Sequence, residues 1–455
     1  MKTYQDFINS KNKESFISEA INDFKTSYNY NRAILAQKYY LGENPAIFNR
    51  MKWFWDSSGN KNRDVFKANN QIASEFYGKI VKQENSYLFS NGINFNDEKE
   101  KIKSNLDKNF DSKIFKAGGY SLVDGVSWIK VNIVNKKMNV EIFRGTEFIP
   151  ILDERNGEIM AGIRFWQLEP SKPIWIEFYE YDGVEEYKMD TEGVELYSKK
   201  KPYRFNILKT MGEEVIESLG EYSRIPIFPL YGTESKTSTL TEALQSKIDA
   251  YDLVASDFVN NLEDAQEIYW VLKNYGGQNL DTFLRDLKKY KTIKVDEDGA
   301  AQAETIDIPH EARKIILESL KKDIFESSMA LNTEDLTGSS LTTTAIKANM
   351  MNLDLKTDIF ESNALNTLNS IVEFYLESTN QDIDYNIELI RRGLVNDSEV
   401  INDIYTFRED ISRREALRLN PQIPNERIEQ ILKEIEEEGS NIDFENFEIK
   451  ERVEE

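Results

Sequence analysis

Apolar residues recur at intervals of three and four along three long segments of the chain, which is the spacing of one helix face. The segments cover residues 240–262, 310–331 and 341–377. At 1.5 Å per residue the first would be on the order of 35 Å long and the third on the order of 55 Å. A single stripe on so long a helix predicts packing against a neighbour along its length. The first stripe comprises Leu240, Leu244, Ile248, Tyr251, Ala255, Phe258 and Leu262, and the second Ile316, Leu320, Ile324 and Ser327.

The opposite face of the 240–262 helix is acidic. Because charged side chains are rarely buried, this face is predicted to be solvated or to line a channel. Its carboxylates belong to Asp249, Asp252, Asp257, Glu263 and Asp264.

A compact segment, residues 266–308, separates the first two helices. It is predicted to contain a strand at 267–272, a short helix at 280–290, and a hairpin that joins 291–295 to 303–308 through the turn at 296–299. A polar loop at 332–340 then leads into the third helix, and the loop and helix start are expected to be exposed and mobile. Two long helices around a small subdomain, followed by a loop and another long helix, favour a ring-forming channel over an enzyme pocket.

The remainder of the chain alternates between helix and sheet. Helices are predicted within 25–51, where Gly42 and Pro45 end the pattern, and across 68–89. Residues 126–231 change to a period of two and predict antiparallel sheet. Two C-terminal helices are predicted around Pro421 and Pro424, with disorder from residue 441 onward.

Some residue types in these regions invite a more specific interpretation. Gly118-Gly119 and Gly276-Gly277 are interpreted as turns. The tryptophans of the sheet region could stack on nucleobases, but without basic neighbours they are better placed in the sheet core and at a subunit interface. They are Trp128, Trp166 and Trp175.

Composition excludes several classes of protein. The 455 residues are 40% hydrophobic and 30% charged, which is typical of a soluble globular chain of two to four domains. No apolar run approaches a membrane span, and the N-terminus lacks the apolar core of a signal peptide, so we expect a cytoplasmic product. With no Cys, disulfides and thiolate sites are excluded. A net charge of −23 argues against a protein that grips nucleic acid by neutralising phosphates, although not against one that lets DNA slide past.

Catalytic chemistry is hard to find. His310, the only histidine, follows a proline at a helix start, where a capping or surface role is favoured. No phosphate-binding glycine loop occurs. The carboxylates of Asp296, Glu297 and Asp298 could hold Mg²⁺ but fit a hairpin turn better. We therefore assign no catalytic, cofactor or metal-binding residue.

Six segments in the same order resemble the portal proteins of tailed bacteriophages, in particular those of long-tailed phages of Gram-positive hosts. The resemblance extends over nearly the whole chain, although no single segment is as specific as a metal motif. The loop departs from the fuller Asn-x-Ser-Gly pattern expected in the family. The segments are residues 39–50, 69–89, 225–231, 247–277, 331–351 and 412–438.

This resemblance implies an α+β portal fold, and a ring of usually twelve subunits at one capsid vertex. Double-stranded DNA would be packaged through it by the terminase large subunit and later ejected. Further partners would be the major capsid and scaffold proteins and a head-tail adaptor, with the protein in the virion and, during assembly, in the host cytoplasm. The implied parts are a wing (1–237), stem helices (238–265 and 309–331), a clip (266–308), a tunnel loop (332–340), a long helix returning to the wing (341–395), a crown (396–440) and an acidic tail (441–455).

The same resemblance implies that the loop lines the narrowest part of the channel. Lys347 and Lys356 would lie nearby as the few basic contacts to DNA. An acidic or neutral wall suits this role, because a basic wall would trap a polyanion. The loop residues are Asn332, Thr333, Glu334, Asp335, Leu336, Thr337, Gly338, Ser339 and Ser340.

Two other classes stay open at this point. One is a metal-dependent nuclease or other phosphoryl-transfer enzyme that uses clustered carboxylates, which Mg²⁺-dependent activity lost on EDTA would reveal. The other is a structural head or tail protein that forms a ring or shell and does not translocate DNA. A channel diameter near that of duplex DNA would separate the portal from this second class.

Overall fold

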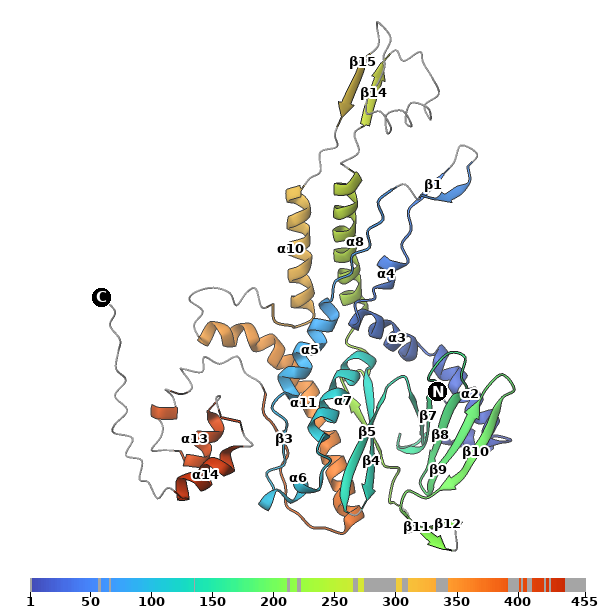
Figure 1. Cartoon of the computed structure of the whole chain (residues 1–455), viewed down its shortest axis with the longest axis vertical. Coiled ribbons are helices and arrows are strands. Elements are labelled where there is room, and N and C mark those ends of the chain that lie inside the picture. Colours follow the sequence, from blue (N-terminus) through green and yellow to red (C-terminus); the bar gives the residue numbers. More distant parts are fainter. Residues whose placement is uncertain are drawn as a thin grey trace. The chain divides into compact units, whose positions relative to one another are not determined.

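The computed structural model confirms a mixture of helices and antiparallel sheets (Figure 1). The chain divides into two compact units, Met1–Asp335 with Met350–Arg392, and Leu336–Asn349 with Gly393–Glu455. The structure describes residues 2–55, 59–64, 67–134, 136–210, 213–218, 222–264, 269–273, 300–304, 310–332, 343–391, 401, 404–406, 411–420, 423–424 and 427–437.

The N-terminal part of the first unit is helical, as predicted. Side-chain caps begin several of these helices; Asn12, for example, accepts a hydrogen bond from the Ser15 backbone N–H at the start of α2. Gly42, with φ of +76°, follows the end of α3, and Pro45 opens the next short helix. The elements are α1 (Tyr4–Asn9), α2 (Lys13–Thr26), α3 (Tyr28–Tyr40), α4 (Pro45–Phe48), β1 (Trp53–Trp55), β2 (Lys61–Arg63), α5 (Phe76–Phe89), β3 (Ile93–Asn94), η1 (Glu98–Glu100), α6 (Lys101–Asn105) and α7 (Phe110–Asp124).

The predicted sheet region forms three separate antiparallel sheets. One has the order β13-β4-β5, one β10-β9-β8-β7-β6, and β11 pairs only with β12. Trp128 is buried beneath Phe148, so the prediction of a core position holds for this tryptophan. The strands are β4 (Val126–Val134), β5 (Lys137–Arg144), β6 (Phe148–Leu152), β7 (Ile159–Trp166), β8 (Ile174–Glu180), β9 (Gly183–Met189), β10 (Val194–Lys201), β11 (Phe205–Thr210), β12 (Glu213–Ser218) and β13 (Ile227–Tyr231).

The prediction of a turn at Gly118-Gly119 is wrong, because both residues lie inside α7. Gly118 faces α5 so closely that a Cβ there would lie 2.2 Å from the Asn85 Oδ1 atom and 2.6 Å from the Phe89 ring. The Asn85 amide also donates to the Phe115 carbonyl of α7 at 2.9 Å. The glycine therefore serves a close helix crossing. Gly276-Gly277 lies outside the described residues.

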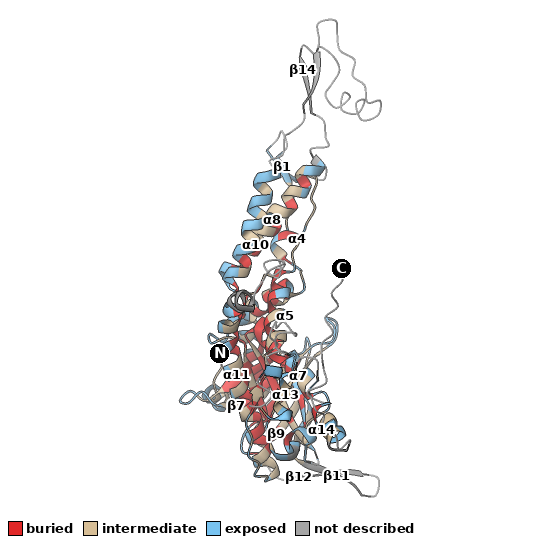
Figure 2. Ribbon diagram, turned by 90° about the vertical axis from the view of Figure 1, so that its left-hand side faces the viewer, coloured by how far each residue is buried: buried red, intermediate tan, exposed pale blue. Residues whose placement is uncertain are grey.

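Two of the three long helices form a pair, α8 (Glu242–Asp264) and α10 (His310–Ser327), close to their predicted bounds. The helix α10 ends earlier than predicted, since Met329 adopts a left-handed conformation with φ of +53°. Leu244, Ile248 and Ile324 are buried in the main core. The predicted stripe fails at Ile316, which is exposed. Figure 2 shows exposed residues along much of both helices.

Beyond this pair, β14 (Tyr269–Lys273) pairs with β15 (Ala300–Glu304) in antiparallel register. The strand predicted at 267–272 is thus observed. Residues 280–299, with the predicted short helix, the 291–295 strand and the turn, lie outside the described residues.

The third long helix is α11 (Thr343–Thr379), and it too lies close to its predicted bounds. Its stripe is buried from Met350 to Tyr375 against α5, α7 and β13 residues of the main core. After it, β16 (Glu388–Leu389) pairs with β3. In the second unit, the two predicted C-terminal helices are α13 (Arg413–Leu419) and α14 (Ile428–Glu437), and residues 438–455 lie outside the described range.

Candidate functional site

The chain's own N-terminal part covers the acidic face of α8 at Asp249, Asp252 and Asp257, which corrects the prediction that these residues are solvated or line a channel. Glu263, near the end of the helix, is exposed as predicted. Asp252 has no exposed surface, and Ser256 and Asn260, four and eight residues further on, are 2% exposed each. All three lie on one face of the helix because of their spacing. The face is therefore an internal contact surface.

The cover is an irregular segment, residues 70–74, which we call the strap. The backbone N–H groups of Asn70, Ile72 and Ser74 donate to Asn260 Oδ1 (2.6 Å), Ser256 Oγ (3.0 Å) and Asp252 Oδ1 (2.9 Å) respectively. Asn260 and Ser256 also donate back to the carbonyl oxygens of Asn70 and Ile72, at 3.3 Å each.

The strap fits α8 because two residues of the strap are about as long as four residues of the helix. Two residues of extended chain span roughly 6.6 Å, and four residues of helix span about 6 Å. The bonds explain why the helix predicted from residue 68 begins only at Phe76: the N–H groups that would continue it are bound to α8. Ile72, which lies within the predicted helix, is exposed in the strap.

Two carboxylates of α8 also hold the chain before the strap. The Asn44 amide donates to Asp249 (3.0 Å) and to Asp252 (2.8 Å). Burial raises the pKa of Asp252, while the hydrogen bonds from Ser74 and Asn44 act against that rise. Tyr39 donates its hydroxyl to Asp249 at 2.5 Å, and burial together with this bond raises the tyrosine pKa.

Asp257 anchors the base of the β1–β2 hairpin. Its carboxylate pairs with Arg50 and Lys52, each at 3.1 Å. Burial alone would raise the pKa of Asp257, but the Lys52 hydrogen bond and the Arg50 charge outweigh it and hold the pKa below its ordinary value. On the α10 side, the Arg313 guanidinium donates to the Asp257 carbonyl at 3.4 Å.

Lys356, predicted as a DNA contact, is paired inside the subunit instead. Its Nζ atom lies 2.5 Å from Glu84 Oε2 on α5, and its side chain is 17% exposed. Burial raises the pKa of Glu84, and the Lys356 charge opposes that rise. In this conformation Lys356 joins α11 to α5 and has little surface to offer DNA.

Arg391 holds α11 in a second clamp, after the Lys356–Glu84 pair. The sequence patterns did not predict it. Its guanidinium pairs with Asp354 (3.5 Å), Asp358 (2.5 Å) and Glu361. Tyr87 donates to Asp354 as well, and its pKa is raised to about 12 by burial and by this carboxylate. The acidic spacing of i, i+4 and i+7 was visible in the sequence and could have indicated a bound cation.

Most other predicted site residues lie where the structure gives no description. These are loop residues 333–340, the side chain of Lys347, and Asp296, Glu297 and Asp298. Asn332 is the one loop residue within the described range, and it is half-buried. His310 is exposed at the start of α10, as predicted, with its ring 5.8 Å from that of Phe258.

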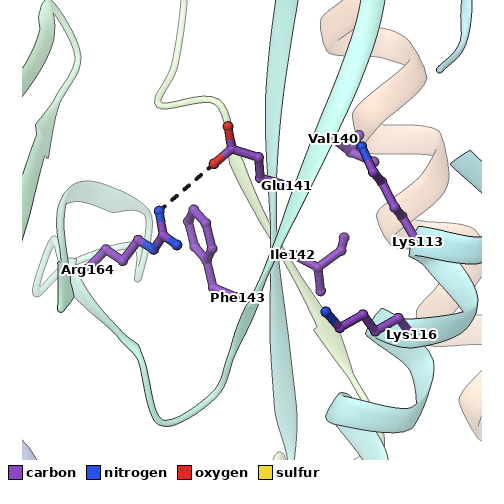
Figure 3. Close-up of a pocket in the computed structure, with 7 residues that line it drawn as sticks. All are labelled: Lys113, Lys116, Val140, Glu141, Ile142, Phe143 and Arg164. Atoms are coloured by element: carbon purple, nitrogen blue, oxygen red, sulfur yellow. Dashed lines mark ion pairs between the residues drawn. The ribbon is translucent and has the colours of Figure 1, made fainter. Parts of the chain in front are cut away.

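Two hollows lie within the described part of the first unit. One borders β5 and is lined by Lys113, Lys116 and Arg164 (Figure 3). Two of these cations have carboxylate partners: Lys113 pairs with Asp107, and Arg164 with Glu141 (3.9 Å) and Glu177 (3.0 Å). The Lys116 Nζ atom lies 5.3 Å from the centre of the Tyr120 ring. We therefore do not assign it a ligand.

The other hollow is an open groove of about 460 Å³ between α8 and α10. Tyr251, Phe258 and Leu317 supply its apolar lining. Its charged lining is mixed, with Glu311 and Glu318 beside Lys314 and Lys321, and Lys314 pairs with Glu318 at 4.0 Å.

Among the described residues, no three His, Asp or Glu side chains are grouped to hold a metal ion. No helix in that part of the chain is both long and apolar enough to cross a membrane.

Comparison with known proteins assigns the family. The profile described as "Phage portal protein, SPP1 Gp6-like" matches residues 24–441. The portal protein of Clostridium phage phiCD119 is 29% identical over 347 residues, which cover 70% of this chain and 74% of the relative. That of Bacillus phage SPP1 is 25% identical over 429 residues, covering 88% and 82%. The chain therefore belongs to the SPP1 Gp6-like family of phage portal proteins. Membership of this structural family gives it a capsid portal role in the virion.

Two solved structures are similar to the chain at a lower sequence identity. A chain in the virion of the native gene transfer agent particle matches with a TM-score of 0.44 and 10% identity, over 77% of this chain and 90% of that chain. One in the neck of the empty particle matches with the same score and identity, over 84% and 99%. The family assignment does not depend on either.

Proposed function

We propose that this chain assembles into a closed ring of twelve subunits at one capsid vertex. Double-stranded DNA enters through the ring, driven by the terminase large subunit, and later leaves through it. The family match over residues 24–441 is the observation that carries this proposal. The apolar stripes of the long helices are largely buried within the subunit, and the apolar residues that stay exposed on α8 and α10 offer contact surface for a closed ring. They are Leu253, Val259, Leu262, Ile315 and Ile316.

The charge of the chain supports the passage of DNA without retention. A net charge of −23 gives no overall basic footprint, so affinity for phosphates should be weak. In this proposal the loop at 332–340 lines the narrowest part of the channel, and Lys347 supplies a basic contact. Lys356 keeps a DNA role only if its pair with Glu84 opens.

The parts follow the portal arrangement in our proposal. Residues 266–308, inserted between α8 and α10, form the clip that meets the terminase and then the head-tail adaptor. Residues 1–237 form the wing, which contacts capsid and scaffold proteins, and 396–440 form the crown. Assembly takes place in the host cytoplasm, and the protein is not an enzyme.

Native mass spectrometry tests the ring. We expect a species of twelve chains, with a channel wide enough for duplex DNA in negative-stain images. A monomer at micromolar concentration in every salt tried, and also after co-expression with capsid and scaffold proteins, would contradict the proposal. A ring whose channel is too narrow for duplex DNA would favour a purely structural head or tail protein, and EDTA-sensitive cleavage of DNA would favour an enzyme.

A further inference from the structure

The β1–β2 hairpin carries three consecutive exposed aromatic residues. Trp53, Phe54 and Trp55 are 49%, 42% and 70% exposed. With rings of roughly 150–250 Å² each, they leave on the order of 300 Å² of aromatic surface in water. The two tryptophans lie on one face of the hairpin and Phe54 lies on the other. Exposed apolar surface of this extent marks an interaction surface.

One face of the hairpin combines tryptophan with cations. Side chains alternate along a strand, so Trp53 and Trp55 share a face. The register Trp53↔Arg63 and Trp55↔Lys61 adds both cations to it, and the Lys61 Nζ atom lies 4.9 Å from the centre of the Trp53 ring. This face is suited to an apolar surface edged by carboxylates.

The groove between α8 and α10 offers such a surface. Tyr251, Phe258 and Leu317 give it an apolar lining. Glu311 and Glu318 add carboxylates seven residues apart on α10, beside Lys314 and Lys321 of the same helix. Lys314 and Glu318 form an exposed ion pair at 4.0 Å, which is weak enough for an incoming cation to replace. Ile315, between those two glutamates in the sequence, is 62% exposed.

Hairpin and groove lie at the same level of the α8–α10 pair. Arg50 and Lys52, at the base of the hairpin, are anchored on Asp257. The Asp257 carbonyl in turn accepts a hydrogen bond from Arg313, whose guanidinium lies 5.7 Å from the Phe258 ring of the groove.

They also lie on different sides of α8. At 3.6 residues per turn, Ser256 and Asn260, which hold the strap next to the hairpin, point about 140–180° away from Tyr251 and Phe258 of the groove. Because the hairpin and the groove lie on different sides of α8, two subunits related by a twofold axis cannot each place a hairpin in the groove of the other. Such docking produces head-to-tail contacts, which close into a ring when the rotation from one subunit to the next completes a full turn.

We propose that the β1–β2 hairpin of each subunit docks into the α8–α10 groove of the next subunit. The tryptophans cover Ile315 and the apolar lining of the groove, and Lys61 and Arg63 pair with Glu311 and Glu318. The contact rests on the proposed ring and names the surfaces that close it. The groove is occupied by a second copy of this chain because the chain carries both complementary surfaces. They lie at the same position along the α8–α10 pair and on different sides of α8.

Disulfide cross-linking tests the contact, and the absence of native cysteine gives it a clean background. The double variant Trp55→Cys/Ile315→Cys should, after oxidation, run as a ladder of covalent oligomers up to the full ring on a denaturing gel. Each single variant should give no ladder. If the double variant forms rings by native mass spectrometry but gives no ladder, the docking proposal is wrong while the ring stands. If no rings form even from the unmodified chain, the proposed function itself fails.

Charge reversal provides a second test. Lys61→Glu/Arg63→Glu and Glu311→Lys/Glu318→Lys should each lower the yield of rings at least tenfold, and the four changes together should restore it to within about twofold. All sites are exposed, so unchanged melting curves will show that the fold is intact. Normal ring yields from both reversed chains overturn the proposal, and so do normal rings that have lost binding to DNA or to a tail protein, since the hairpin would then serve that partner.

Discussion

At the scale of single residues, buried charges in this chain join helices that are distant in sequence. Glu84 of α5 is 2% exposed and meets Lys356 of α11, 272 positions later. Burying a charge costs desolvation free energy, and the attraction of a paired opposite charge offsets that cost. If one partner is removed, the other remains buried with its desolvation cost uncompensated. Such a pair fixes which faces of the two helices meet.

Lys356→Met should therefore destabilise the subunit by about 3 kcal/mol, since it leaves Glu84 buried and unpaired. The double variant Glu84→Leu/Lys356→Met should recover to within about 1 kcal/mol of the unmodified chain. Urea unfolding measures both. A Lys356→Met chain of unchanged stability that packages DNA poorly would instead support the predicted DNA contact. Lys347→Met is the comparison, for which we expect impaired packaging at normal stability.

Asp257 makes the hairpin anchor sensitive to acid. Its folded pKa lies below the ordinary value of 3.8, so its pairs stabilise the fold above that pH and are lost as the pH falls through the folded pKa. Because the group is about one-third exposed, the contribution should be only about 0.5–1 kcal/mol.

The stability gap between Asp257→Asn and the unmodified chain should therefore be present at pH 6 and should shrink steadily below pH 4. Urea unfolding at several pH values measures it. Asp323→Asn, an exposed change on α10, is the control and should show little gap at any pH. A gap that is the same at every pH would mean that the Asp257 charge is not what holds the hairpin base.

At the scale of elements, the crossing of α5 and α7 depends on which of two adjacent glycines faces the neighbouring helix. A Cβ on Gly118 would meet Asn85 and Phe89, whereas the nearest atom to one on Gly119 is 3.6 Å away. The same substitution should thus have opposite effects at the two positions.

Gly118→Ala should destabilise the chain by about 2 kcal/mol, as overpacking outweighs the gain in helix propensity. Gly119→Ala should stabilise it by about 0.5–1 kcal/mol, because the methyl group fits and alanine favours helix. Thermal or urea unfolding gives both signs. Equal effects at the two positions would show that α5 does not approach α7 as described.

The elements also show how far the sequence could predict this fold. The long stripes predicted α8, α10 and α11 within a few residues at most ends, because a buried helix face must repeat every 3.6 residues. The burial of Asp252 on the acidic face of α8 was not predicted, since it depends on donors at Asn44 and Ser74, about 180 to 210 positions earlier. Local patterns do not contain such partners. The turn at Gly118 failed for the same reason: glycine permits a turn and a close crossing equally, and only Asn85 and Phe89 decide between them.

At the scale of the whole molecule, the boundary between the two compact units falls within α11, after Asn349 and before Met350. On the side of the first unit, Lys356 and Arg391 fix the helix to α5 and to the segment after β16. The proposed channel loop precedes α11, so a change in the loop need not disturb these clamps.

Replacing residues 333–339 by a short Gly-Ser linker should therefore permit ring assembly and capsid incorporation while impairing DNA packaging or retention. Native mass spectrometry reports the ring, and the amount of nuclease-resistant DNA in capsids reports packaging. Packaging at the normal rate to normal density would make the loop an ordinary connection between helices.

The strap sets a rule for how this protein family can change length. Each pair of strap residues is matched to one interval of four residues on α8, from Asp252 to Asn260. One residue inserted into the strap would turn the N–H groups on one side of the insertion away from α8. The hydrogen bonds that those groups donate to α8 would then break. A relative with a longer α8 should keep the match only by adding two strap residues for every four helix residues. Insertions in the two segments, which lie 178 to 190 positions apart, should therefore occur together and in the ratio of one to two.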